Sequence, residues 1–248
     1  MPTPTAAVLV IGSEVLSAKV RDENGPWLAG RLRELGVLLV SIRTLPDRTD
    51  AIVEAVDAER RRVDWLFTCG GVGPTHDDLT LPAVALALGR PLQRSEVLAE
   101  ALRALHRRHG GGGEIPEAAL RMADLPAGTR LLGDARFPTL AVENVVMLPG
   151  VPEFLRLQFD RIATELRGSP FRLASLYLSL GEDRLAPLLD RVARAHPRVE
   201  IGSYPRFDEA DHRVRVTLEG KDEGLVRAAL EAVLASLPPG AVVRSEGP

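Results

Sequence analysis

The sequence predicts a three-layer α/β/α domain with a mostly parallel sheet, followed by a smaller α+β lobe with a ferredoxin-like order of elements. The first observation is that short apolar runs alternate with helical segments through the first two-thirds of the 248 residues. Such alternation is typical of parallel strands joined by crossover helices. The second is that the order then changes to strand, helix, strand, strand, helix, strand, the split arrangement of ferredoxin-like folds. We therefore expect one domain at residues 1–168 and a second at 171–248.

The amino-terminal elements follow from local pattern. Residues 6–11 read AAVLVI, a continuously apolar run expected of a parallel strand that is buried on both faces. After a polar loop, Asn24 is expected to cap a helix that has Pro26 in its first turn, where a missing N–H costs nothing. Gly36 ends this helix, and residues 37–42 form the second strand.

The same reasoning assigns the remaining elements. The glycine run at residues 110–113 is expected to be a flexible connection between elements rather than a phosphate loop. In the first domain we expect helices at 50–62, 81–88, 96–108 and 153–166 and strands at 65–68 and 144–148. In the second domain we expect strands at 171–180, 199–204, 214–219 and 241–244 and helices at 183–195 and 223–237. The strand at 214–219 is expected to be central and carries no aromatic residue that could stack on a base. We therefore interpret this lobe as structural or oligomerising rather than RNA-binding.

Composition restricts the class of protein. Hydrophobic residues make up 45% and charged residues 26% of the chain, as in soluble globular proteins. A net charge of −3 gives no electrostatic reason to expect a nucleic-acid or membrane partner. Cys69 is the only cysteine, so no intrachain disulfide and no cysteine-based zinc site is expected. The first apolar run is too short for a signal peptide or membrane span, and a cytoplasmic location is expected.

The stretch TCGGVGPTHDDLT, residues 68–80, combines a glycine-rich turn with two acids. Such a turn between a strand and a helix lets backbone N–H groups approach phosphate oxygens, an attraction of at most about 2 kcal/mol. A carboxylate about 5 Å from a phosphate charge opposes it by roughly 3 kcal/mol at an effective dielectric constant near 20. If Asp77 and Asp78 are both ionised, the loop can hold a phosphate only with a divalent cation between them, or with one aspartate facing away.

A simpler interpretation is that Asp77 or Asp78 caps the following helix, for which Thr80 is a competing cap. Two other loops that follow strands also carry acids, Glu14 and Asp47. Because the carboxyl ends of parallel strands form one edge of a sheet, we expect these acids to converge there. Converging acids are costly unless they bind metal or transfer protons, so we predict a metal-assisted phosphate site.

The motif GGVGPTHDDLT, preceded by IGSEVLSAKVRDEN and followed by MLPGVP, resembles the molybdopterin-binding family of molybdenum-cofactor biosynthesis proteins (MoaB- and MogA-like). Within it, the resemblance is strongest to the amino-terminal domain of CinA-type competence/damage-inducible proteins and to the related domain of FAD synthases. It covers roughly residues 5–167. It implies an α/β domain that binds a nucleotide or a molybdopterin-like small molecule.

The resemblance also implies activities and assembly. CinA-type relatives cleave the pyrophosphate of ADP-ribose or related dinucleotides with a divalent metal such as Mg²⁺, Mn²⁺ or Co²⁺, and the molybdopterin branch binds or adenylylates molybdopterin. Relatives form dimers or trimers. We therefore consider a metal-dependent nucleotide pyrophosphatase first, a molybdopterin-binding or adenylyl-transfer protein second, and a non-catalytic relative third.

Individual site residues follow from the motif and the resemblance together. By resemblance, Asp78 matches the acid of the family's catalytic loop and Asp47 the acid after the second strand, while Glu14 and Asn24 match polar positions of the first loop. Asp78, Asp47 and Glu14 are the predicted catalytic residues, and Asp77 and Asp78 the predicted metal ligands. The predicted ligand- and phosphate-binding residues are Gly12, Ser13, Asn24, Gly70, Gly71, Gly73, Pro74, Thr75, Thr80, Pro149 and Gly150.

Some residues remain open between two roles. The Thr75 hydroxyl group is expected either to bind a phosphate or to close the turn, and His76 either to assist proton transfer or to have no role. Lys19 pairs with a phosphate or is solvated. His106 and His109, three residues apart on a helix, permit metal binding but fit a solvated helix end better.

The chain also departs from the family pattern. CinA-type members have a GTAPGF-like segment where residues 131–145 read LLGDARFPTLAVENV, with Gly133 and Phe137 as the nearest matches. The family's Asp-Thr-Asn is Asp22-Glu23-Asn24 here. The deamidase domain of long CinA proteins does not follow within the 248 residues.

Overall fold

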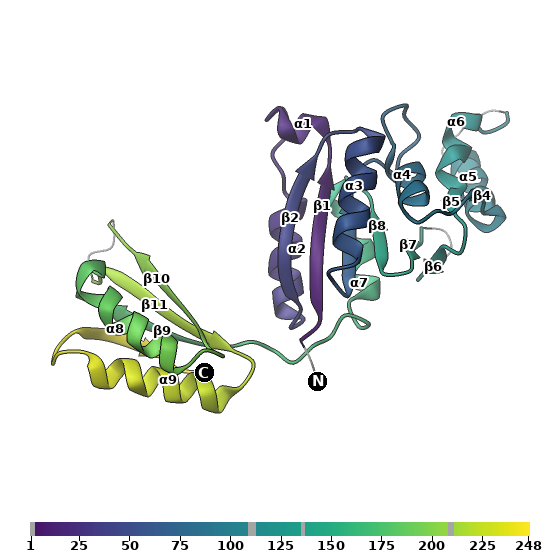
Figure 1. Cartoon of the computed structure of the whole chain (residues 1–248). Coiled ribbons are helices and arrows are strands. Elements are labelled where there is room, and N and C mark those ends of the chain that lie inside the picture. The colour runs from purple at the N-terminus through teal and green to yellow at the C-terminus, as the bar shows by residue number, and fades with distance from the viewer. Residues whose placement is uncertain (1–2, 109–112, 135–136, 208–210) are drawn as a thin grey trace. The chain divides into compact units, whose positions relative to one another are not determined.

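The structure of the protein, a computed structural model, describes residues 3–108, 113–134, 137–207 and 211–248. The chain forms two compact units, Met1–Gly168 and Ser169–Pro248, each with its own sheet (Figure 1). His109 and most of the glycine run at 110–113 lie outside the described residues. Among the residues that are described, no helix is both long and apolar enough to cross a membrane.

The first unit is built on a six-stranded sheet. Its spatial order is β2 (Leu38–Leu45), β1 (Thr5–Ile11), β3 (Trp65–Cys69), β8 (Val145–Leu148), β7 (Thr139–Val142) and β6 (Arg130–Leu132). The first four strands are mutually parallel, β7 runs antiparallel to β8, and β6 runs antiparallel to β7. The predicted mostly parallel sheet is thus confirmed, with antiparallel pairing at one edge.

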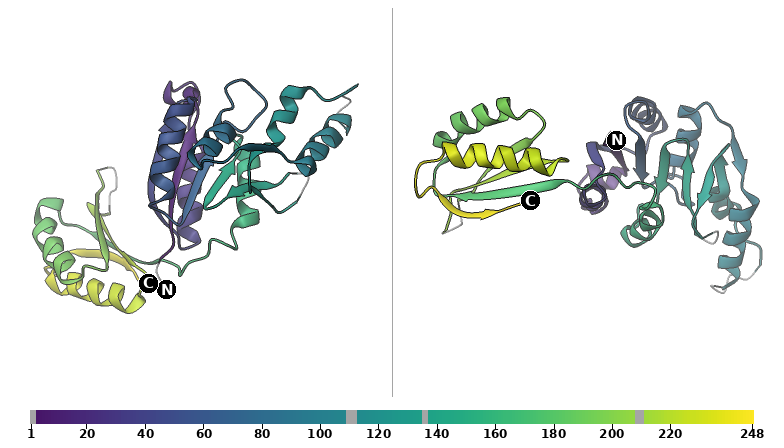
Figure 2. Two further views of the ribbon diagram at one scale, coloured as in Figure 1. Left: turned by 45° about the vertical axis from the view of Figure 1, so that its right-hand side comes forward. Right: turned by 90° about the horizontal axis from the view of Figure 1, so that it is seen from below.

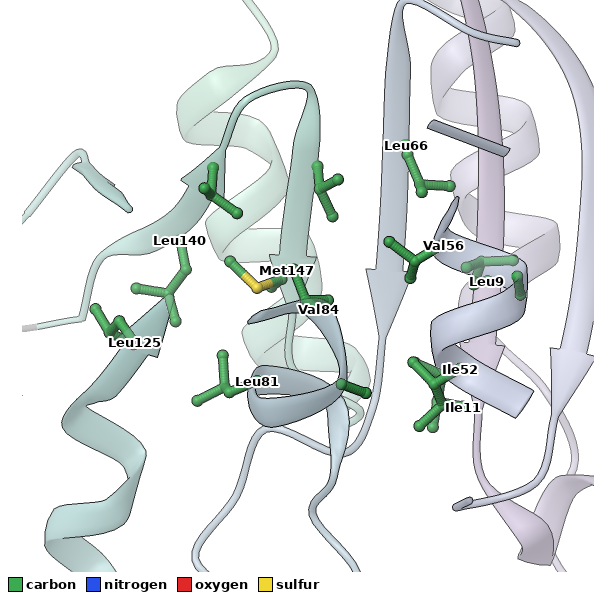
Figure 3. Close-up of a cluster of buried hydrophobic side chains, with 14 of the residues drawn as sticks. Leu9, Ile11, Ile52, Val56, Leu66, Leu81, Val84, Leu125, Leu140 and Met147 are labelled. Atoms are coloured by element: carbon green, nitrogen blue, oxygen red, sulfur yellow. The ribbon is translucent and has the colours of Figure 1, made fainter. Parts of the chain in front are cut away.

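Helices cover both faces of this sheet, which explains why β1 is apolar throughout. On one face lie α2 (Asn24–Glu34) and α7 (Pro152–Ile162), and on the other α3 (Thr49–Arg60), α4 (Thr80–Ala87) and α5 (Glu96–Arg108). Along β1, alternate side chains enter the two cores. Figure 3 shows Leu9 and Ile11 of β1 in the same cluster as Ile52 of α3 and Val84 of α4. On the opposite face, the Phe159 ring packs against that of Phe67, with centroids 5.5 Å apart.

Two local differences from the expected elements have physical causes. β2 extends to Leu45 rather than to residue 42 because it pairs with β1 as far as Ile11. We predicted that Asn24 would cap α2, but the structure shows that Asn24 is the first residue of this helix. Instead, Asp22 Oδ1 accepts from the backbone N–H groups of Asn24 and Gly25, at 2.9 and 3.0 Å.

Short elements that carry little periodicity were not predicted. They are α1 (Ser13–Leu16), the strand pair β4 (Leu92–Arg94) and β5 (Asp124–Pro126), α6 (Glu117–Leu120), the 3₁₀ turn Arg121–Ala123, and the strands β6 and β7. With three or four residues each, they are too short to show a helical or a strand period.

The second unit has the predicted ferredoxin-like order. Its elements are β9 (Arg172–Leu178), α8 (Glu182–Ala195), β10 (Glu200–Pro205), β11 (Val214–Gly220), α9 (Glu223–Ser236) and β12 (Val242–Glu246). The strands lie in the order β10-β11-β9-β12, and every neighbouring pair is antiparallel. Both helices cover the same face of the sheet (Figure 2).

One prediction about this sheet was incomplete. β11 carries no aromatic residue, but β9 is also central and carries Tyr177. The guanidinium carbon of Arg244 lies 3.9 Å from the Tyr177 ring centroid and that of Arg215 lies 5.8 Å from it. Because these groups cover it, Tyr177 is only 9% exposed and is not available to stack on a base.

Candidate functional site

The carboxyl ends of the four parallel strands meet at one edge of the first unit. Gly12 N, just after β1, donates to Leu45 O at the end of β2 (3.0 Å), and Gly70 N, just after β3, donates to Leu148 O at the end of β8 (3.2 Å). The loops that leave these strands therefore start side by side. All the predicted site residues lie in or next to these loops.

The glycine loop 70–73 needs two of its glycines for steric reasons. Gly70 and Gly71 have φ angles of 99° and 64°, which side chains rarely adopt. A Cβ atom on Gly70 would collide with Ile11 O, and one on Gly71 would lie 2.5 Å from Thr80 Oγ1. The loop thus packs directly on the end of β1. Its glycines also leave the backbone N–H groups open to the close approach of an anion that phosphate binding requires.

Thr80 anchors the far side of this loop. Its buried hydroxyl group donates to Gly70 O (2.7 Å), and its backbone N–H donates to Gly71 O (2.9 Å). Thr80 therefore shapes the loop and does not present its hydroxyl group to a ligand. Because Thr80 is also the first residue of α4, the positive end of that helix dipole adjoins the loop.

The two aspartates of the loop point in different directions. Asp78 Oδ2 accepts from the Thr75 backbone N–H (2.7 Å) and from the Thr75 hydroxyl group, so the carboxylate is turned inward and closes the turn. The Asp77 side chain is 60% exposed, and that of His76, 96% exposed, lies 3.9 Å away. The Thr75 hydroxyl group, ahead of the Asp77 backbone N–H, lowers the pKa of the Asp77 carboxyl.

Two arrangements would let the loop hold a phosphate despite its two acids: a divalent cation, or one aspartate that faces away. The structure shows the second arrangement, with Asp77 turned outward. Neither Asp77 nor Asp78 caps α4, because no side chain accepts a bond at that helix start. Of the two roles considered for Thr75, the structure shows the closing of the turn.

The acids of the other two loops are held by local contacts. Asp47 Oδ2 accepts from Ser13 N (2.7 Å), and Asp47 N donates to Ser13 Oγ (3.1 Å), so this reciprocal pair links the ends of β1 and β2. Glu14, in α1, folds back over Gly12. A Cβ atom on Gly12 would lie 2.5 Å from Glu14 Oε1.

Asn24 links the first loop to the turn after β8. Its Nδ2 group donates to Gly150 O (2.7 Å), and Gly150 packs so closely on Gly70 that an added Cβ would lie 3.3 Å from Gly70 Cα. The Asn24 donor is therefore occupied by the protein. Sequence reasoning missed Asp22, which holds the start of α2. The sequence feature that could have identified this role is an aspartate placed two residues before Asn-Gly-Pro, with which the helix begins.

Cys69 lies beneath this edge. Burial, followed by the charge of nearby Asp22, raises the pKa of its thiol, so the group stays protonated and acts as a small core residue.

The carboxylates do not form the cluster that we expected. Among the described residues, no group of three or more His, Cys, Asp or Glu side chains is placed to hold a metal ion. The acids share an edge, but each is turned by its own local contacts. Mg²⁺ is commonly held by only one or two carboxylates together with substrate phosphates. Asp77 and Asp78 point in different directions, so their two carboxylates do not form such a pair in the structure.

The segment that departs from the family pattern is described except for residues 135–136, which lie outside the described residues. β6 ends at Leu132 and β7 begins at Thr139, and the register pairs these two residues, and also Leu140 with Met147. Since β7 is antiparallel to β8, its start lies beside the carboxyl end of β8. Phe137 packs there against Phe154 of α7, with ring centroids 5.1 Å apart.

Comparison with known proteins finds a family that matches each unit. Residues 7–168 match the family described as a probable molybdopterin-binding domain, and residues 170–246 match the middle domain of FAD synthase. The chain is 34% identical to a probable FAD synthase from Caenorhabditis elegans, over 94% of this chain and 49% of that protein. It is 31% identical to a CinA-like protein from a Thermotoga species, over 92% of this chain and 57% of the relative.

The chain thus spans about half the length of these two relatives. Among solved structures, the protein CinA from Thermoplasma acidophilum, described as having unknown function, superposes with a TM-score of 0.58 at 26% identity. The alignment covers 66% of this chain and 98% of that one.

Proposed function

We propose, from the premise that this chain belongs to the molybdopterin-binding family and carries a FAD synthase middle domain, that its first unit is a metal-dependent pyrophosphatase. The substrate would be a nucleotide with a diphosphate linkage, of the ADP-ribose or FAD type. The observation that carries the proposal is the glycine loop, which offers backbone N–H groups at the strand ends while Asp78 is tied inward and Asp77 is turned outward.

The loop supports phosphate binding for electrostatic reasons. The positive end of the α4 dipole adjoins it, and its glycines allow phosphate oxygens to come close to the backbone. Only one carboxylate is directed at the loop, so the repulsion is less than two converging acids would cause. Backbone N–H groups of Gly71 and Gly73 would then stabilise charge that develops on the phosphate during cleavage.

Each acid can be given a role from its contacts. A divalent ion bound with the substrate, and held by Asp78, would neutralise phosphate charge as a Lewis acid, and the outward-facing Asp77 would have to rotate toward the loop to become a second ligand. Asp47 has one carboxylate oxygen fixed by Ser13 N, so its other oxygen has a defined direction in which to accept a proton from an attacking water. Glu14, exposed beside Gly12, is the alternative base.

The test is hydrolysis of ADP-ribose and of FAD by the full chain, with Mg²⁺, Mn²⁺, Co²⁺ or a chelator, followed by chromatography of the nucleotide products. We expect metal-dependent release of AMP and a loss on the order of 10²-fold in Asp78→Asn, because removal of one charge-stabilising group at such a centre commonly costs this much. Asp160→Asn removes an exposed carboxylate that pairs with Arg31 on the helices α2 and α7 and serves as the control. Equal rates for the parent and Asp78→Asn would end the proposal.

A second function, binding or adenylyl transfer of molybdopterin, is supported by the family description of residues 7–168. Calorimetric titration with the pterin separates the two. Tight pterin binding without turnover of any dinucleotide favours this second function. A chain that shows neither heat nor a change in melting temperature with any nucleotide or pterin, with or without metal, would be a non-catalytic relative.

A further inference from the structure

The glycine loop and the turn after β8 leave the sheet toward opposite faces. β3 leads through the glycine loop to α4 on one face, whereas β8, its neighbour in the sheet, leads through residues 149–151 to α7 on the other face. In α/β domains, ligands bind at the carboxyl ends of neighbouring strands whose connections part in this way. A phosphate on the glycine loop would therefore have the start of α7 beside it.

The start of α7 carries an exposed aromatic ring. Phe154 lies in the first turn of this helix and is 49% exposed. A helical side chain leans toward the amino-terminal end of its helix, so the Phe154 ring covers the region around Val151, which is apolar and also exposed. These two side chains thus adjoin the turn in which Gly150 packs on Gly70.

A second ring supports that of Phe154. The Phe137 ring meets it in a T-shaped arrangement, with centroids 5.1 Å apart and ring planes at 65°. The segment that carries Phe137 is fixed to α7, because Arg161 Nη1 donates to the Phe137 carbonyl oxygen and Thr139 Oγ1 donates to Gln158 O (2.9 Å). The exposed ring therefore rests on a neighbour whose own position is held by hydrogen bonds.

The distance from the glycine loop to this aromatic pair suits a ring that is linked to a phosphate. β8 lies between β3 and β7 in the sheet, and neighbouring strands are about 4.8 Å apart. The start of β7, next to Phe137, is therefore roughly 10 Å from the end of β3, where the loop begins. In nucleotides and flavin phosphates, a ribose or a ribityl chain separates the planar ring from the phosphate by a span of this order.

We propose that Phe154, supported by Phe137, is the platform on which the planar ring of the substrate stacks. This inference rests on the proposed function, in which the phosphate of a ring-bearing diphosphate occupies the glycine loop, and it adds the part of the protein that recognises the ring. Stacking on an aromatic side chain tolerates different rings, because each has a π face. The platform therefore selects ring-bearing phosphates over sugar phosphates, whether the ring is an adenine, a flavin or a pterin.

The small size of the apolar surface favours a single ring as its occupant. The exposed apolar side chains on this side of α7 are only three, Val151, Phe154 and Leu157. Exposed charged side chains of the same helix lie between and beyond them, namely Glu153, Arg156 and Asp160. A protein interface needs a wider area with an apolar centre, whereas one heteroaromatic ring covers no more than this surface offers.

The test measures binding without turnover. Calorimetric titrations of the full chain with Mg²⁺ use FMN and AMP, which carry a ring, and ribose 5-phosphate, which carries no such ring. We expect Phe154→Ala to bind FMN and AMP roughly tenfold more weakly than the parent, as the loss of one aromatic stack commonly does, and to bind ribose 5-phosphate unchanged. Phe154→Trp keeps an aromatic ring and should bind FMN and AMP like the parent.

Two control variants remove apolar groups elsewhere. Phe207→Ala removes a 91% exposed ring from the second unit, and Leu157→Ala removes the exposed side chain that lies one turn further from the strand ends on α7. Both should bind the three ligands like the parent, and circular dichroism confirms that every variant is folded. An equal loss in Leu157→Ala and Phe154→Ala would overturn the proposal, because it would show a general apolar surface.

The outcomes separate this inference from the proposed hydrolysis. A parent that binds neither FMN nor AMP, or a Phe154→Ala variant that binds both like the parent, overturns the platform even if the chain cleaves ADP-ribose and FAD. A chain that cleaves neither dinucleotide but loses affinity for FMN and AMP in Phe154→Ala supports the platform and contradicts the proposed hydrolysis.

Discussion

At the scale of single residues, the glycines and the threonines of the loop decide its shape. Gly70 adopts φ 99° against the Ile11 carbonyl, and Thr80 and Thr75 close the two ends of the turn. Each of these contacts joins two groups of the protein, so the shape of the loop is held by the chain's own backbone and side chains.

Gly70→Ala should destabilise the unit by more than about 2 kcal/mol, because it adds both a left-handed backbone penalty of about 1 kcal/mol and a collision with Ile11 O. Gly89→Ala is a matched control, since Gly89 has φ 62° and open space around it, so it should cost only about 1 kcal/mol. Urea unfolding of both variants measures the difference. Equal losses would mean that the loop does not pack on β1 as described.

Thr75→Val should raise the pKa of Asp77, because the Thr75 hydroxyl group is the main cause of its lowered value. A lowered pKa in the folded state stabilises the fold above the ordinary pKa of the group, and this stabilisation is lost as the pH falls through the folded value. In the variant, Asp77 should therefore protonate at a higher pH during acid titration, followed by carboxyl NMR. Thr129→Val, which removes a bond to Pro126 O away from the loop, should leave Asp77 unchanged.

At the scale of elements, the site depends on bonds between loops that are far apart in the sequence. Asn24, the first residue of α2, donates to Gly150 in the turn that precedes α7. This bond holds the start of one helix against the start of another across 126 positions of sequence. The edge of the sheet is therefore a connected structure rather than a set of independent loops.

Asn24→Asp keeps the shape of the side chain but removes its N–H donor and places a charge near the Gly150 carbonyl. We expect a loss of about 1–3 kcal/mol, together with a higher KM for any nucleotide substrate, because Gly150 packs on the glycine loop. Asn24→Ala should be no more destabilising, since it leaves a single unpaired acceptor. Thermal melts and initial-rate kinetics check both. An unchanged KM would separate this bond from the phosphate site.

At the scale of the whole molecule, the two units have separate cores. All predicted catalytic and phosphate-binding residues lie in Met1–Gly168. A fragment of residues 1–168 should therefore retain hydrolysis of the proposed substrate within about threefold. Initial-rate kinetics of the fragment, with circular dichroism to confirm that it is folded, test this prediction. Loss of all activity in a folded fragment would show that the second unit contributes to the reaction.

The amino-acid pattern was enough to predict the main elements. A strand buried on both faces must be apolar throughout, as in β1, and an amphipathic helix such as α5 shows its period in the spacing of its apolar residues. The pattern also placed the glycine loop and the predicted acids at one edge, since parallel strands end together. The direction of each polar side chain could be learned only from the folded chain. Asp78 turns inward, Asp77 outward, and Asn24 toward Gly150 because of partners that neither periodicity nor spacing encodes. Hydrophobic pattern is a local property of the chain, whereas the direction of a polar group depends on whichever donors the fold brings within about 3 Å of it.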